Sequence, residues 1–98
     1  MSEPTYCVYV IELDGVSGND PDKPVVYVGQ SAVPPEVRFQ QHLDGYKSSR
    51  YLRRYGVRLR PRLYRTHNPL PSRVAALERE KELARRLRKR GYTVFGGH

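Results

Sequence analysis

The sequence of 98 residues predicts one small α+β domain, residues 1–98, in which helices flank a three-stranded antiparallel sheet. Two early stretches are rich in β-branched and aromatic residues, which favours strands. Glycine and proline divide much of the remainder into short segments, and one long amphipathic stretch lies toward the C-terminus. The predicted order of elements is therefore β-β-α-α-β-α.

The three predicted strands are recognised by their residue types. Residues 5–13 (TYCVYVIEL) and 25–29 (VVYVG) are predicted to pair as an antiparallel hairpin. Residues 14–24 join them as a loop, because glycine, proline, asparagine and aspartate crowd there. Residues 57–64 (VRLRPRLY) alternate and predict a third strand, in which Pro61 indicates an edge position.

Prolines and a capping serine mark the predicted helices. Residues 35–44 begin with a proline, which is tolerated in a first helical turn. Residues 48–55 predict a second, short helix. Ser72 caps a long helix that continues to Arg90. Residues 92–95 leave room for a short terminal strand.

The charge of the chain is unevenly distributed. The net charge is +8, but residues 1–44 carry two Lys or Arg against seven acids, whereas residues 45–98 carry sixteen against three. A basic half of this density suits a polyanion, and the guanidinium fork of arginine matches phosphate oxygens. The sequence therefore favours nucleic acid as the partner. The alternative is an ordinary solvated basic surface.

Cysteine use and hydropathy exclude several classes of protein. Cys7 is the single cysteine, so neither an internal disulfide nor a cysteine-based metal site is expected. Its apolar neighbours predict a buried side chain. No apolar run approaches the length of a membrane span, and the first residues do not resemble a secretory signal. We expect a cytoplasmic protein with no membrane partner.

Two tyrosines occupy equivalent positions in the first two predicted strands. If the strands are neighbours, the phenols of Tyr9 and Tyr27 can converge on one face. Gly29, which follows Tyr27 by two residues, permits a close approach of its backbone by another chain or by a phosphate. The alternative is that both tyrosines only pack the sheet.

Three further polar residues stand out by their spacing. Arg38 and His42 lie four residues apart on a predicted helix, where they could grip a phosphate and handle a proton. Glu80 falls near the middle of the apolar stripe of the long helix. A carboxylate there is costly unless it is paired with arginine or binds a metal, and both alternatives stay open.

Taken together, these residues resemble the GIY-YIG nucleases. The resemblance covers residues 5 to about 97. It rests on two tyrosine motifs, Cys7-Val8-Tyr9 and Tyr27-Val28-Gly29-Gln30-Ser31, followed in order by Arg38, His42 and Glu80. The family's β-β-α-β-α core is also close to the order of elements predicted above.

The resemblance implies hydrolysis of a nucleic-acid phosphodiester with one divalent metal ion, Mg²⁺ or Mn²⁺, held by Glu80. Arg38 would neutralise charge on the phosphate. Tyr9, or as second choice Tyr27, would orient or deprotonate the attacking water, and His42 would share the proton work. We expect DNA rather than RNA as the substrate, with a partner protein available for targeting.

Residues near the site and in the basic stretch are expected to contact the substrate. The expected nucleic-acid-binding residues are Gly29, Gln30, Ser31, Lys47, Arg50, Arg53 and Arg54, and the arginines at 58, 60 and 62 would hold further backbone phosphates. No signature of base recognition is present.

Three departures from the family keep alternatives open. Cys7 stands where the motif has glycine, residues 15–24 look like an insertion, and residues 92–98 lack the asparagine that usually braces the site. Asn68 is not at the expected place for it. The chain could therefore be a nucleic-acid-binding module with weak or lost catalysis. A basic structural protein that docks on ribosomal RNA is a third alternative.

Overall fold

The computed structural model describes residues 5–15, 22–45 and 50–97. Strands β1 (Cys7–Leu13) and β2 (Val25–Ser31) form the predicted antiparallel pair. Their register places Tyr9 opposite Gly29 and Ile11 opposite Tyr27. Of the loop predicted between the strands, residues 16–21 lie outside the described part of the chain.

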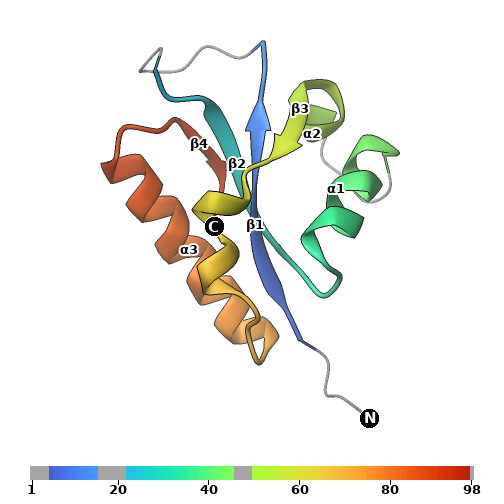
Figure 1. Cartoon of the computed structure of the whole chain (residues 1–98), viewed down its shortest axis with the longest axis vertical. Helices are drawn as coiled ribbons and strands as arrows, with labels where there is room; N and C mark the ends of the chain where they lie inside the picture. Colours follow the sequence, from blue (N-terminus) through green and yellow to red (C-terminus); the bar gives the residue numbers. More distant parts are fainter. Residues whose placement is uncertain (1–4, 16–21, 46–49, 98) are drawn as a thin grey trace.

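The sheet has four strands in the order β3-β1-β2-β4 (Figure 1). Strand β3 (Gly56–Leu59) pairs antiparallel with β1, whereas β4 (Val94–Gly96) runs parallel to β2. The prediction of a three-stranded, wholly antiparallel sheet is therefore wrong, because a fourth strand is present and runs parallel to β2. This strand is the short terminal one for which residues 92–95 left room. A parallel neighbour needs a long crossover, and the C-terminal helix provides the returning segment.

The third strand is shorter than predicted. It ends at Leu59, and short 3₁₀ helices η1 (Pro61–Leu63) and η2 (Arg65–His67) replace the rest. Proline has no N–H to donate to a strand partner and fixes a φ that suits a helical turn. The edge position that Pro61 indicated is confirmed, since β3 is the outermost strand beside β1, but the strand ends before that proline.

Three α-helices complete the fold. They are α1 (Pro35–Leu43), α2 (Arg50–Tyr55) and α3 (Arg73–Lys89). Ser72 caps α3 as predicted, because its hydroxyl accepts a hydrogen bond from the N–H of Ala75 at 3.1 Å. No helix in the described residues is long and apolar enough to cross a membrane.

Both faces of the sheet are covered. Consecutive residues Val8, Tyr9, Val10 and Ile11 are each no more than 2% exposed, which requires a layer on either side of β1. Helix α1 lies to one side of the sheet and α3 to the other (Figure 1). Tyr9 faces α1, since its hydroxyl meets His42 on that helix, and the alternate residues face the α3 side.

Asn68 extends the edge of β1. Its side-chain amide accepts from the N–H of Val8 and donates to the carbonyl of the same residue, both at 2.8 Å. A short bridge between Tyr6 and Leu70 continues the pairing. The amide thus takes the place of a strand neighbour, and the polar groups of a buried backbone position are satisfied. This role was not visible in the sequence.

Candidate active site

Gly29 lets two phenols lie close together over the sheet. Because Tyr9 is directly opposite Gly29, its ring extends over a position with no side chain. A Cβ atom at residue 29 would lie 2.5 Å from the Tyr9 hydroxyl oxygen and 3.1 Å from Cε1 of Tyr27. The space predicted for another chain or a phosphate at Gly29 is therefore taken by the Tyr9 side chain, and the glycine is required by the positions of both tyrosines.

Tyr9 and His42 form a buried hydrogen-bonded pair. The Tyr9 hydroxyl lies 2.9 Å from Nε2 of His42, and the two residues are 2% and 3% exposed. The His42 ring also lies beside Tyr27, with ring centroids 6.3 Å apart. Burial, aided by the nearby charge of Arg38, lowers the pKa of His42 to about 4. The imidazole is therefore neutral at pH 7, and its unprotonated ring nitrogen can accept a hydrogen bond.

Arg38 provides a positive charge next to the phenols. Burial is the largest influence on Tyr9 and Tyr27, and it raises the pKa of each hydroxyl. Arg38 opposes that effect at both tyrosines and also donates a hydrogen bond to Oε1 of Gln41 at 3.0 Å. In the resting site both phenols are protonated, and positive charge nearby favours their ionised form.

Glu80 brings a carboxylate to the same place from the other layer. It is 6% exposed on the buried side of α3, in line with Ala76, Leu83 and Leu87. Its negative charge contributes to the raised pKa of both Tyr9 and Tyr27, which places it within electrostatic range of the phenols. Residues from two strands and two helices thus converge at one site.

The donors at this site suit a hard divalent cation. In residues 5–15, 22–45 and 50–97, no group of three or more His, Cys, Asp or Glu side chains could hold a metal ion. Glu80 supplies carboxylate oxygens, and the two tyrosines supply phenolic oxygens. Oxygen donors are those that Mg²⁺ prefers, and it commonly binds through one or two carboxylates and keeps several waters. The residues therefore fit such an ion held mainly by Glu80.

A groove of about 490 Å³ opens beside Arg38, and we call it the Arg38 groove. Its lining residues are Tyr6, Gln30, Ser31, Ala32, Val33, Arg38, Gln41 and Arg73. Two of the predicted nucleic-acid contacts, Gln30 and Ser31, are among them. The Ser31 hydroxyl accepts from the N–H of Val33 at 3.0 Å, so it also shapes the turn that follows β2.

Arg73 is a candidate that the sequence analysis missed. It is the first residue of α3 and is exposed at the Arg38 groove. A positive charge is unfavourable at the N-terminal end of a helix dipole. The first turn of α3 holds no acidic residue, so this position is unusual on both counts. That unfavourable position is the signal by which the sequence could have marked Arg73 as a candidate site residue.

The remaining predicted contacts are placed unevenly. Lys47 lies outside the described residues, as do the side chains of Arg50 and Arg53 in α2. Arg54 is exposed, with its guanidinium 5.4 Å from the centre of the Tyr55 ring. The arginines at 58, 60 and 62 are not at the Arg38 groove but line a separate one. Any backbone phosphates that they hold therefore lie away from the Arg38 groove.

Comparison with known protein families gives one match. Residues 5–93 match the family described as the GIY-YIG catalytic domain. No curated protein and no solved structure matches the chain. The matched region includes every element of the candidate site, from β1 through α3.

Proposed function

The chain belongs to the family of GIY-YIG catalytic domains, which are nucleases, and we propose that it is a metal-dependent endonuclease acting on DNA. The observation that carries the proposal is the buried pair of Tyr9 and His42, with Arg38 and Glu80 beside it. Packing alone gives no reason to place a carboxylate, a guanidinium and a neutral imidazole around two phenols. Perturbed ionisable groups gathered in this way are typical of catalytic sites.

Tyr9 is placed to take a proton from the attacking water. As its oxygen accepts that proton, its own can pass to Nε2 of His42 along the existing 2.9 Å hydrogen bond. Nδ1 of His42 is buried and has no hydrogen-bond partner among the described residues. The imidazole therefore has no onward route for the proton within this part of the chain. We infer that the proton returns through Tyr9 when the product leaves.

The remaining groups stabilise charge. Arg38 neutralises negative charge that develops on the phosphate in the transition state. Tyr27, held protonated by burial, can donate to the same oxygens or orient the water. Glu80 holds the divalent cation, which when bound stabilises the leaving oxygen.

The Arg38 groove is the proposed path of the substrate strand into the site. Arg38 and Arg73 border it, and each can form a forked pair of hydrogen bonds with phosphate. Gln30 and Gln41 add uncharged hydrogen-bonding groups to its lining. None of these contacts depends on base identity, so backbone recognition without strong sequence preference is expected.

A cleavage assay with purified protein tests the proposal. Labelled single-stranded, duplex and branched DNA, and matched RNA, are incubated with Mg²⁺, Mn²⁺ or a chelator. We expect cutting of DNA that requires the metal and falls by two to three orders of magnitude in Tyr9→Phe, roughly the effect of losing a general base. Tyr9→Phe prepared in parallel also serves as the control for contaminating nucleases.

Two outcomes would contradict the proposal. Binding of nucleic acid without cutting under any metal would support the alternative of a binding module. Cutting of RNA alone would retain a nuclease but overturn DNA as the substrate.

A further inference from the structure

A second groove, of about 530 Å³, is bordered by η1, by the end of β3 and by the residue that follows α3. We call it the η1 groove. Its lining residues are Arg58, Leu59, Arg60, Pro61, Arg62, Leu63 and Arg90. Four of these seven side chains are arginines, so the groove has a strongly positive lining. This is the surface to which the arginines at 58, 60 and 62 belong.

The η1 groove lies on the opposite face of the sheet from Tyr9 and His42. Arg60 donates to Oε1 of Glu12 at 2.8 Å, and Nε of Arg58 lies 3.7 Å from Oε2 of the same carboxylate. Glu12 is three residues from Tyr9 along β1, and side chains of a strand alternate between its faces. Tyr9 faces α1, so Glu12 and the arginines around it face the α3 side.

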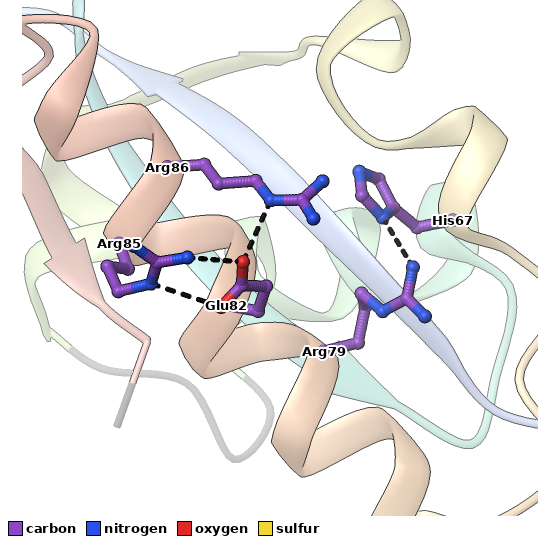
Figure 2. A network of polar contacts seen from close by, with 5 residues as sticks. All are labelled: His67, Arg79, Glu82, Arg85 and Arg86. Atoms are coloured by element: carbon purple, nitrogen blue, oxygen red, sulfur yellow. Dashed lines mark hydrogen bonds and ion pairs between the residues drawn. The ribbon is translucent and has the colours of Figure 1, made fainter.

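The positive surface continues along α3. Arg79, Arg86 and Arg90 recur at intervals of seven and four residues, which places them within a sector of about 40° on the helix. Figure 2 shows Arg79 and Arg86 extending toward His67 of η2. Arg79 donates to Nδ1 of His67 at 3.0 Å. Burial, followed by the charges of Arg79 and Arg86, lowers the pKa of His67, so the imidazole stays neutral beside them.

Two carboxylates hold arginines in place without neutralising the surface. Glu82 accepts from Arg85 and Arg86, and these bonds lower the pKa of Glu82 to about 2 (Figure 2). Glu12 forms ion pairs with Arg58 and Arg60.

Most of the positive charge on this side therefore remains available. Among the described residues, no acidic side chain pairs with Arg62 or Arg90; the latter has its guanidinium 5.9 Å from the centre of the Tyr92 ring. This surface carries two carboxylates, Glu12 and Glu82, against six arginines, which are those at 58, 60 and 62 near η1 and those at 79, 86 and 90 along α3 and just after it. An arginine excess that acids orient in this way is suited to a phosphate backbone.

We propose that the η1 groove binds the phosphate backbone of a second nucleic-acid segment while the first lies in the Arg38 groove. The proposal rests on the proposed function in taking nucleic acid as the ligand. The two grooves lie at the two ends of α3, because Arg73 at its start lines the first and Arg90 just after its end lines the second, about 25 Å away along the helix. The second segment is therefore either another arm of a branched substrate or a separate nucleic-acid molecule.

The test measures binding by the full chain in a chelating buffer, where cutting does not interfere. Anisotropy titrations over a range of salt use a labelled linear duplex and a four-way junction. We expect Arg62→Gln and Arg90→Gln each to reduce the log–log salt slope on the junction by about one, as for one lost phosphate contact. Arg90→Lys should keep the slope, since it retains the charge.

Lys81→Gln is the matched control, because it removes one exposed charge from the opposite side of α3. Thermal unfolding of each variant confirms that it is folded. If Arg62→Gln and Arg90→Gln weaken binding no more than Lys81→Gln does, the proposal is overturned. That result is also expected if the groove takes an acidic protein instead.

The stoichiometry distinguishes the two sources of the second segment. An arm of the same substrate predicts one tightly bound junction per protein, and a separate molecule predicts two linear duplexes per protein. In either case, the binding of the second segment should be lost in Arg90→Gln. Cutting is measured separately: an inactive protein with the expected salt slopes would contradict only the proposed nuclease function. An active protein whose nucleic-acid binding is unchanged by Arg62→Gln and Arg90→Gln would contradict only the proposed binding at the η1 groove.

Discussion

Replacing Gly29 with alanine tests whether the close approach of Tyr9 to β2 positions the catalytic phenol. The new Cβ would lie 2.5 Å from the Tyr9 hydroxyl oxygen and 2.6 Å from Cζ, about 1 Å less than ordinary contact. Tyr9 is 2% exposed and hydrogen-bonded to His42, so its ring has little room to move aside. The phenol or the strand must therefore shift.

Gly29→Ala should lower the cutting rate much more than it lowers the free energy of unfolding. Overpacking of a core typically costs about 1–3 kcal/mol, and a gain of about 0.4–1 kcal/mol from restricting the unfolded chain partly offsets it. The φ angle of Gly29 is not in the left-handed region, so alanine adds no backbone strain. A displacement of roughly 1 Å at a reacting group can lower the rate about 100-fold. We expect a folded protein with strongly reduced cutting.

Single-turnover cleavage and urea denaturation measure the two effects. The control places the same alanine in a Tyr9→Ala background, where the closest contacts are gone and most of the stability cost of residue 29 should vanish. If Gly29→Ala cuts at the parental rate, the position of the Tyr9 phenol does not matter for catalysis. If the stability cost persists without the Tyr9 ring, the clash has another origin.

Three further predictions concern residues around the site. The pKa of His42 falls from 6.5 to about 4 on folding, so the unfolded chain binds more protons between these pH values, and the free energy of unfolding should drop by about 3 kcal/mol as pH falls from 7 to below 4. Denaturation measured across this pH range should show the drop in the parent but not in His42→Gln, and parallel curves for the two proteins would contradict it. Asn68→Ala should destabilise the fold by about 1–3 kcal/mol, because the buried polar groups of Val8 lose their partner, and an unchanged urea midpoint would refute this role. Arg73→Ala should weaken substrate binding and lower the salt slope by about one, whereas Arg73→Lys retains the slope; equal binding by the alanine variant would exclude the proposed path along the Arg38 groove.

Short-range patterns explain what could be predicted. The period of two in a strand placed Tyr9 and Tyr27 for convergence, and the four-residue spacing on α1 placed Arg38 and His42 on one side. The apolar stripe of α3 identified Glu80 as a buried carboxylate, and it is 6% exposed. In each case the signal lay within a single element.

Pairings between distant segments could not be predicted in the same way. The direction of β4 depends on how α3 returns the chain, and its three residues carry too little pattern to choose a neighbour. Asn68 pairs with Val8, sixty residues away. The association of the basic half of the chain with a polyanion stays a prediction, and the arginines at 58, 60 and 62 lie across the sheet from Tyr9. Charge counting cannot assign side chains to a face.

The central claim is that Glu80 holds a divalent cation beside the phenols so that the chain can cut DNA. Glu80→Gln tests it most directly, because the amide keeps the shape of the side chain and removes the negative charge. Single-turnover cutting is measured across a titration of Mg²⁺ and of Mn²⁺, with DNA binding in a chelating buffer as the control for folding. We expect Glu80→Gln to bind DNA at least as well as the parent but to cut at background level at ordinary metal concentrations. Cutting by Glu80→Gln at the parental rate, with the same metal dependence, would contradict it.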